Sequence, residues 1–219
     1  MKFFLRIIIC LGLCSGLYAE SAGDVAMAVS ALSSTVVEPT IILDAGHGGV
    51  DEGAKVKNFK EKRICLATVL LVKKNLEERG YRVILTRWKD NYVSLPKRVS
   101  IANRSQAAIF VSIHYNASSN HNAKGIEIYY HDSKERSRAW SSKRLASCIL
   151  PSLIDNTSAS SRGVRRGNFH VIRETQMPAV LIEGGFVTNP KERDLLRDKT
   201  YIELIAKGIA EGIEKYLKS

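Results

Sequence analysis

Residues 40–49 read TIILDAGHGG, and this stretch decides the fold. An apolar, β-branched run begins after Pro39 and ends at Asp44, where small and flexible residues follow. A run of this length bounded by proline and glycine is typical of a strand that is buried on both faces of a sheet. The same stretch therefore predicts that His47 lies just beyond the carboxyl end of a buried strand.

The rest of the chain repeats this strand signal in alternation with helical spacing. In residues 61–79 the apolar side chains follow a helical period up to Gly80, which predicts an amphipathic helix with a glycine stop. Such alternation favours a single α/β domain in which helices cover both faces of one sheet. Further strands are predicted at 81–86, 108–114, 125–130, 169–173 and 179–183, further helices at 94–106, 134–150 and 191–217, and a polar surface loop at 155–168.

Two of these helices have boundaries that depend on particular residues. Ser94 is expected to be the N-cap of the helix at 94–106, because Pro96 fits the first helical turn. Pro151 is expected to end the helix at 134–150, because proline lacks the N–H that a helix interior requires.

The composition is that of a globular chain with a sizeable core. Its 219 residues are 45% hydrophobic and 25% charged, which excludes a disordered, fibrous or disulfide-stabilised miniature protein. The formal net charge of +11 predicts an acidic partner: nucleic acid, an anionic lipid surface or an anionic cell-wall polymer. A basic surface without a specific target remains an alternative explanation of the same charge.

The first residues are predicted to direct the chain out of the cytoplasm. Residues 1–19 place Lys2 and Arg6 around an apolar run that ends in small residues, which is the layout of a secretory signal peptide. Cleavage is expected after Ala19 rather than after Ala28, and the mature protein is expected in the periplasm. No later segment is expected to span a membrane.

The predicted export defines the mature part of the chain and reduces the number of possible partners. Residues 20–39 are expected to be a flexible lead-in, and residues 40–219 the folded domain. Lipidation at Cys14 is disfavoured because a leucine, rather than a small residue, precedes it. The mature chain would keep Cys65 and Cys148, which predict neither a disulfide framework nor a cysteine metal site. Export and the lack of a nucleic-acid-binding motif argue against nucleic acid as the partner.

Three side chains able to bind a metal lie at the ends of predicted strands, and a fourth opens a helix. His47, His114 and Glu183 lie where buried strands end, and the carboxyl ends of parallel strands converge on one crevice. Glu61 opens the helix after His47 and is able to turn its carboxylate back toward that histidine. Two imidazoles and one carboxylate are the ligands of many catalytic zinc sites, which keep a fourth position for water. Spacing alone leaves simply hydrogen-bonded histidines as the alternative.

The motifs around these residues match one family. In their order along the chain they resemble the zinc-dependent N-acetylmuramoyl-L-alanine amidases of the Amidase_3 type, over about residues 40–217. Several motifs in the correct order are far more specific than any one of them. The matching segments are DAGHGG (44–49), EK (61–62), TR (86–87), SIHYN (112–116) and MPAVLIEGGFVTN (177–189).

This resemblance implies a fold, a reaction and roles for four residues. The fold is a mixed, mostly parallel six-stranded sheet with helices on both faces, so residues 40–219 would be a catalytic domain. The reaction is hydrolysis of the amide that joins the lactyl group of N-acetylmuramic acid to the L-alanine of a stem peptide, and the partners would be peptidoglycan or muropeptides. His47, Glu61 and His114 would bind Zn²⁺, and Glu183 would move the proton between water and the departing amine. The need for a protein activator stays open.

Two other functions remain open from the sequence. A zinc carboxypeptidase with the same site would release a terminal amino acid, whereas the amidase frees a peptide that begins with L-alanine. A non-hydrolytic peptidoglycan-binding protein would bind cell walls without holding zinc.

Other residues that could carry chemistry are expected to have structural roles. Asp44 is expected to accept backbone N–H bonds in its turn or to orient His47. Ser94 and Lys97 match the Ser-x-x-Lys pattern of acyl-serine enzymes, but a helix cap explains the serine better. Loop-holding hydrogen bonds are expected of Arg87, Arg98, Asn116 and Asn189, and surface or supporting positions of His121, His131 and His170.

Overall fold

The structure, a computed structural model, describes residues 39–219, and a six-stranded sheet forms its centre. The strand order is β4-β1-β5-β8-β6-β7, in which the first four strands are parallel and β6 runs antiparallel to β8. The strand at the far edge, β7, runs parallel to β6. The strands are β1 (Thr40–Ala45), β4 (Arg82–Leu85), β5 (Ile109–Asn116), β6 (Ile126–Tyr130), β7 (Ser161–Arg166) and β8 (Ala179–Phe186).

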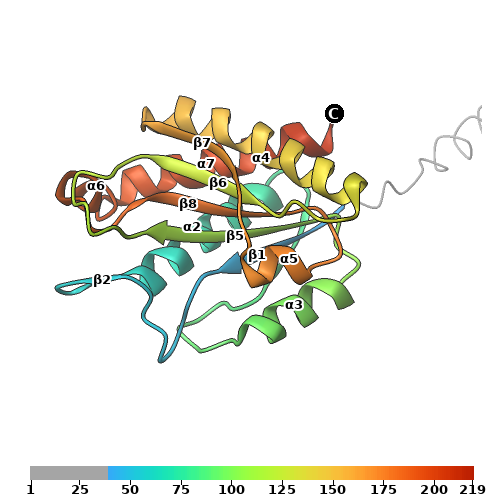
Figure 1. Ribbon diagram of the computed structural model, residues 1–219, viewed down its shortest axis with the longest axis horizontal. Helices are drawn as coiled ribbons and strands as arrows, with labels where there is room; N and C mark the ends of the chain where they lie inside the picture. The colour runs from blue at the N-terminus through green and yellow to red at the C-terminus, as the bar shows by residue number, and fades with distance from the viewer. Residues whose placement is uncertain (1–38) are drawn as a thin grey trace, which may run out of the picture. The chain divides into compact units, whose positions relative to one another are not determined.

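Helices cover both faces of this sheet, as predicted. One face carries the larger core, in which α2, α4 and α7 pack on the sheet, and the other face carries α3 and α5 (Figure 1). Successive side chains of β1 point to opposite faces of the sheet, so helices must cover both faces to bury them. Ile41 and Leu43 belong to the larger core and Ile42 to the smaller one, and none of the three is exposed. The helices are α2 (Glu61–Glu77), α3 (Leu95–Arg104), α4 (Arg136–Thr157), α5 (His170–Glu174), α6 (Pro190–Leu195) and α7 (Lys199–Leu217).

Two predicted elements are wrong, and they are neighbours in the chain. Residues 169–173 form the short helix α5 rather than a strand, because one helical turn is enough to bury Val171 and Ile172 in the smaller core. The loop predicted at 155–168 contains the edge strand β7. Backbone pairing to β6 makes this strand, whose side chains are exposed or half-buried and lack the apolar alternation that predicts strands.

Pro151 does not end α4, which continues to Thr157. The proline is exposed, whereas the next two residues, Ser152 and Leu153, are buried. A Cβ on Gly208 of α7 would lie 2.9 Å from the Cα of Leu153, so the two helices approach each other closely. This packing stabilises the last turns of α4 despite the missing N–H bond.

The helix predicted at 94–106 differs only at its boundaries, whereas the one predicted at 191–217 is two helices. Ser94 is the N-cap residue of α3 by its backbone, since its carbonyl accepts the Arg98 N–H at 3.0 Å, but its side chain makes no capping hydrogen bond. The helix predicted at 191–217 is divided into α6 and α7, and the Asp198 side chain caps α7.

A small hairpin that the sequence did not predict leads into α2. It consists of β2 (Lys55–Val56) and β3 (Phe59–Lys60), and its end places Glu61 at the first position of the helix. Cys65 and Cys148 are free thiols. None of the helices in residues 39–219 has the length and apolar character that a membrane crossing requires. The predicted signal peptide (1–19) and nearly all of the lead-in lie outside the described residues.

Candidate active site

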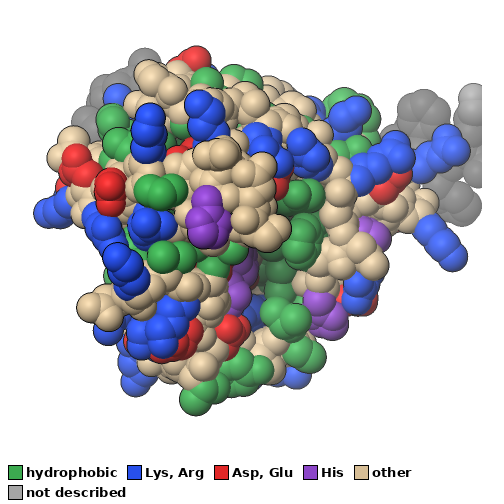
Figure 2. Space-filling view, turned by 60° about the vertical axis from the view of Figure 1, so that its left-hand side comes forward, with side chains coloured by type: hydrophobic (Ala, Val, Ile, Leu, Met, Phe, Trp, Pro, Cys, Tyr) green, Lys and Arg blue, Asp and Glu red, His purple; other side chains and the backbone are tan. Residues whose placement is uncertain are grey.

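The carboxyl ends of β1, β5 and β8 bring the predicted site residues together. These three strands are neighbours in the sheet, and His114 and Glu183 are register partners. One residue separates His47 from the end of β1, and His47 has a positive φ of 59°, which turns the chain at the strand end. Figure 2 brings this end of the sheet forward and shows histidine side chains set back in a hollow of the surface.

Glu61 contacts both histidines with one oxygen atom. Its Oε1 lies 3.0 Å from Nε2 of His47 and 3.0 Å from Nδ1 of His114. The two imidazole rings are nearly perpendicular, with centroids 4.8 Å apart. Backbone N–H groups fix the carboxylate, because Tyr115 donates to Oε1 at 3.1 Å and Ala54 donates to Oε2 at 2.8 Å. The predicted return of Glu61 toward the first histidine is therefore confirmed.

The charges of this cluster favour a cation at its centre. Burial alone would raise the pKa of Glu61, but hydrogen bonds from His114 and His47 lower it well below the usual value, so the carboxylate is ionised. Burial likewise would lower the pKa of His47, but Glu61 and Asp51 raise it above its usual value. A positive charge between these groups is thus stabilised.

The three side chains suit a metal ion by their donor set and their spacing. A tetrahedral zinc ion with nitrogen and oxygen ligands at about 2.0–2.1 Å separates its ligand atoms by roughly 3.3 Å. The 3.0 Å separations to Glu61 come close to this value, and the donor atoms of all three residues lie within 4.8 Å of one another. Within residues 39–219, His47, Glu61 and His114 are the group of histidine and acidic side chains gathered closely enough that they could hold a metal ion.

Two glycines make room for these ligands. A Cβ on Gly46 would lie 2.4 Å from Cε1 of His114, and a Cβ on Gly53 would lie 2.6 Å from both Glu61 Oε2 and His47 Cδ2. Any side chain at either position would displace a ligand. Gly53 also has a φ of +66°, which favours glycine.

Asp51 orients His47, and sequence reasoning missed this role. The Asp51 Oδ2 atom lies 2.9 Å from Nδ1 of His47, on the ring nitrogen opposite the one that faces Glu61. Its other oxygen accepts the Gly53 N–H at 3.1 Å. Metal-binding imidazoles commonly have such a carboxylate partner, which fixes the ring orientation. The only sequence signal was the spacing of four residues between the histidine and the aspartate.

Glu183 faces the cluster across a cavity of about 330 Å³. The cavity is lined by the three metal-binding candidates and Glu183, with Phe169 and Leu181 as apolar walls. The Glu183 Oε2 atom is buried and has no hydrogen-bond partner among the described residues. Burial raises the pKa of Glu183 well above its usual value, and the nearby carboxylates of Glu61 and Glu127 raise it further.

Asp44 does not orient His47, contrary to the prediction, and its side chain accepts no backbone N–H bond from the described residues. It is buried and accepts hydrogen bonds from the side chains of Thr86 at 2.5 Å, Arg98 at 2.6 Å and Ser112 at 2.7 Å. Burial raises its pKa, but the Arg98 charge and these hydrogen bonds lower it below the usual value. Asp44 therefore ties β1 to β5 and α3.

The predicted loop-holding residues have that role. Arg87 donates to the carbonyl oxygens of Ala45, Gly46 and Lys62, which hold the loop before the first histidine against α2. Arg98 donates to the His47 carbonyl at 2.6 Å. Asn189 caps α6 and so holds the loop before it. Asn116 is the exception, because it joins β5 to Glu127 on β6 and lines the cavity that contains Glu183.

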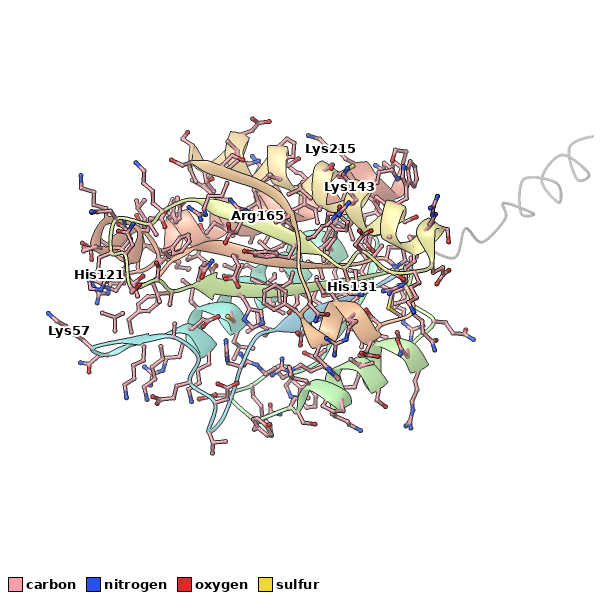
Figure 3. The ribbon with its side chains drawn as sticks, viewed as in Figure 1. Lys57, His121, His131, Lys143, Arg165 and Lys215 are labelled. Carbon is pink, nitrogen blue, oxygen red and sulfur yellow. The ribbon has the colours of Figure 1, made fainter. Side chains whose placement is uncertain are left out.

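The other histidines lie outside the cluster. His121 is exposed in the loop after β5, and His131 follows β6 at the opposite end of the sheet (Figure 3). His170 is half-buried at the start of α5.

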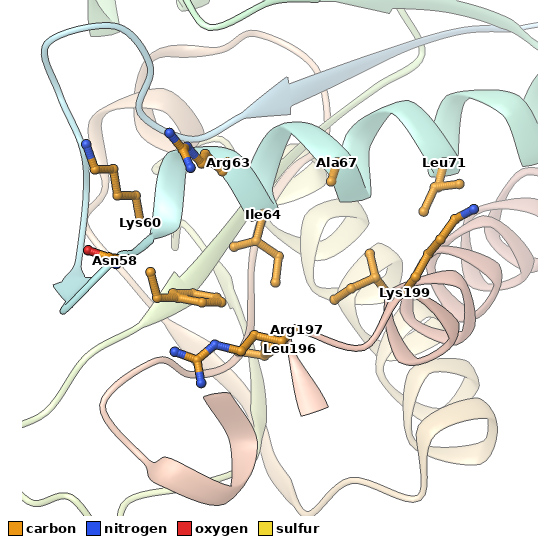
Figure 4. A pocket seen from close by; sticks show the side chains of 11 residues that line it. Asn58, Lys60, Arg63, Ile64, Ala67, Leu71, Leu196, Arg197 and Lys199 are labelled. Carbon is orange, nitrogen blue, oxygen red and sulfur yellow. The ribbon is translucent and has the colours of Figure 1, made fainter. Parts of the chain in front are cut away.

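A larger hollow of about 650 Å³ lies between α2 and the start of α7 (Figure 4). Apolar side chains such as Phe59, Ile64 and Leu71 line it together with four lysines and arginines, and none of its lining residues is a histidine or a carboxylate. It therefore offers no carboxylate or imidazole to hold a metal ion.

A sheet of this topology with a histidine–glutamate–histidine cluster and a second, unpartnered carboxylate defines a metal-dependent hydrolase. The family described as N-acetylmuramoyl-L-alanine amidase, Amidase_3, matches residues 41–215. The chain belongs to this family, and the resemblance stated from the sequence is confirmed.

Individual relatives agree with this membership. The chain is 36% identical over 187 residues to the N-acetylmuramoyl-L-alanine amidase LytC of Bacillus subtilis, covering 85% of this chain but only 37% of LytC. The catalytic domain of the amidase CwlV from Bacillus (Paenibacillus) polymyxa is 40% identical, with a TM-score of 0.77, covering 82% of this chain and 98% of that domain. The CwlD amidase of Clostridioides difficile, solved in complex with the GerS lipoprotein, is 38% identical with a TM-score of 0.77, covering 83% and 99%.

Proposed function

We propose that this protein hydrolyses the amide between the lactyl group of N-acetylmuramic acid and the L-alanine of the stem peptide, in cell-wall turnover or septal cleavage. The observation that carries the proposal is a single cavity in which the His47, Glu61 and His114 cluster faces Glu183. Family membership supports the identity of the bond.

His47, Glu61 and His114 would hold a zinc ion. Two imidazole nitrogens and one carboxylate oxygen are a donor set of catalytic zinc sites, in which a fourth position remains open. When bound, zinc supplies a Lewis acid that polarises the scissile carbonyl and lowers the pKa of water. Asp51 and the backbone N–H groups of Ala54 and Tyr115 keep the ligands oriented.

Glu183 would carry the proton in both halves of the reaction. A carboxylate beside the attacking water takes up its proton and returns it to the departing amine. The unpartnered, buried Oε2 atom is available for both transfers. Burial raises the pKa of Glu183 above that of an exposed glutamate, which suits a group that both takes up and returns a proton.

The proposed substrate lies outside the cytoplasm, so the reaction requires export. The signal-peptide prediction for residues 1–19 agrees with this requirement, and we propose a periplasmic location. The net charge of +11 suits an anionic cell-wall polymer, whose stem peptides carry carboxylates. Neither nucleic acid nor a membrane span is part of this proposal.

A protein activator is part of the proposal as well. The CwlD amidase has been solved with a lipoprotein bound to it, and this chain is 38% identical to that amidase over the 83% of its length that aligns. That complex supports a protein partner for this chain.

The test is a mass-spectrometric analysis of the products that the zinc-loaded protein releases from a defined muramoyl-peptide. A free peptide with an amino-terminal L-alanine is the expected product. Release of a terminal amino acid would instead indicate a carboxypeptidase. Binding to cell walls without any cleavage, by a protein that holds no zinc, would indicate a binding role and overturn the proposal.

A further inference from the structure

A buried carboxylate next to the active site holds two arginines that the reaction described above does not use. Glu127 on β6 is only 2% exposed and is in register with the proposed proton carrier on β8. Its Oε1 atom accepts hydrogen bonds from Asn116 Nδ2 at 2.7 Å and from the Tyr129 hydroxyl at 2.9 Å. Its Oε2 atom lies 2.9 Å from Nε of Arg162 and 3.1 Å from Nε of Arg165.

An irregularity in β7 brings both arginines to the same carboxylate. Residues three positions apart on a regular strand point to opposite faces of the sheet. Between β6 and β7, however, the register shifts, so that Ile126 pairs with Ser161 and Glu127 pairs with Gly163. Arg162 is the extra residue of this bulge, and bulges near active sites commonly redirect a side chain.

The two guanidinium groups exceed what the buried carboxylate requires. A single buried negative charge is balanced by one cation, and here there are two. Arg162 donates from Nε to Glu127, whereas Nε of Arg165 forms an ion pair with Glu127 and donates its hydrogen bond to the Arg162 carbonyl at 3.2 Å. Within residues 39–219 no group accepts a hydrogen bond from either terminal nitrogen of Arg165. The guanidinium of Arg162 stacks on the Phe186 ring at 4.9 Å, with Nη1 3.5 Å from the Lys124 carbonyl.

Both arginines remain accessible from outside. The side chain of Arg162 is 33% exposed and that of Arg165 is 48% exposed. Arg165 lies on the β6–β7 side of the sheet (Figure 3), and a Cβ built on Gly163 would meet no atom within 4 Å. A planar guanidinium whose terminal nitrogens are free is suited to bind a carboxylate with two parallel hydrogen bonds.

The proposed proton transfer indicates which part of a substrate would reach these arginines. If Glu183 gives its proton to the departing amine, that amine lies beside β8. The metal-binding cluster occupies the β1–β5 side, so the peptide leaves the cavity on the other side, over β6 and β7. Neighbouring strands are about 4.8 Å apart and an extended peptide advances about 3.4 Å per residue. The residue after L-alanine would therefore lie over Glu127.

We propose that Arg162 and Arg165, held in place by Glu127, bind a free carboxylate on the second residue of the stem peptide. This inference rests on the proposed function, since the direction of the peptide follows from the role of Glu183. The ligand class is an acidic peptide, and the arginines determine specificity without taking part in the chemistry.

The test compares two peptides that begin with L-alanine and differ only in the second residue, which carries either a free α-carboxylate or the carboxamide. Calorimetry measures their binding to the zinc-loaded protein. The acid is expected to bind about tenfold more tightly than the amide, as one charge-assisted contact requires. In Arg165→Gln this preference is expected to disappear, and Arg165→Lys is expected to restore part of it.

Arg166→Gln is the matched control, because Arg166 is on the same strand, is 74% exposed and pairs with Asp132 instead of Glu127. It is expected to keep the full preference. Thermal unfolding checks that each variant folds. If Arg165→Gln does not fold, Arg162→Gln provides a second test. Equal binding of the two peptides by the wild type, no binding of the acid, or an unchanged preference in a folded arginine variant would overturn the inference.

A second arm separates this inference from the proposed function. The same pair of peptides attached to N-acetylmuramic acid is offered as a substrate, and cleavage is measured. A preference for binding the acid without cleavage of either substrate would overturn the proposed function and keep the carboxylate site. Cleavage of both substrates at equal kcat/KM, together with equal binding, would keep the function and overturn the site.

Discussion

Replacement of Gly46 by alanine tests whether the backbone itself shapes the metal centre. The new Cβ would lie 2.4 Å from Cε1 of His114, and ordinary contact begins at 3.4 Å, so the ring must retreat by about 1 Å. Metal sites tolerate about 0.2 Å in their ligand distances. The ring can move by leaving the cluster, so we expect zinc affinity to fall by at least about 100-fold while the fold is retained.

The assay is a titration of zinc against a competing chelator, together with denaturant unfolding of the metal-free protein. Gly208→Ala is the matched control, because its Cβ would lie 2.8 Å from the Ser152 carbonyl, far along the chain from the cluster. Overpacking predicts a loss of about 1–3 kcal/mol in the free energy of unfolding for both variants. Only Gly46→Ala is expected to lose zinc affinity. Binding of one zinc ion by Gly46→Ala with wild-type affinity would refute the assignment of His114 as a ligand.

Three further substitutions test the supporting residues. Asp51→Asn removes the charge that orients His47 and is expected to lower zinc affinity about 10- to 100-fold in the same titration, and an unchanged affinity would contradict its role. Asp44→Asn leaves the buried Arg98 without its counter-ion and is expected to cost about 3–5 kcal/mol of unfolding free energy. The pKa of Asp44 is lower in the folded protein than in the unfolded chain, so ionised Asp44 stabilises the fold at neutral pH. This stabilisation is lost as the pH falls below about 3.9 and the carboxylate takes up a proton. The unfolding free energy of Asp44→Asn is therefore expected to vary less over that acid range. Ser94→Ala is expected to change the unfolding free energy by less than about 0.5 kcal/mol and to leave turnover intact, and covalent labelling of Ser94 by a β-lactam would contradict this.

The parts of the fold that the sequence predicted correctly are those whose stability comes from apolar side chains. The run at 40–44 is buried on both faces and therefore has the composition of a central strand. The edge strand β7 escaped prediction because its pairing comes from backbone hydrogen bonds, while its side chains are mainly exposed arginines. Pro151 misled the prediction because tertiary packing against α7, which a local rule does not include, stabilises the helix beyond it.

In the candidate site, too, some residues could be predicted from the sequence and others could not. The motifs identified His47, Glu61, His114 and Glu183, and the structure brings all four to one cavity. The supporting carboxylates could not be found in this way. Asp51 and Glu127 act through contacts that depend on a turn and on a strand register, and neither leaves a periodic signal in the sequence. Asp44 was assigned a role beside His47 because the two are close in the chain, whereas its partners come from α3, β5 and the loop after β4.

The most direct test of the central claim compares the zinc content and the turnover of the wild-type protein and Glu183→Gln in the same preparations. We expect one zinc ion per chain in both proteins and a loss of about 10²- to 10⁴-fold in the rate at which the variant releases peptide from a muramoyl-peptide. A Glu183→Gln protein that keeps near wild-type turnover would contradict the assignment of Glu183 as the proton carrier. Loss of zinc from the variant would contradict the proposal that Glu183 is not one of the zinc ligands.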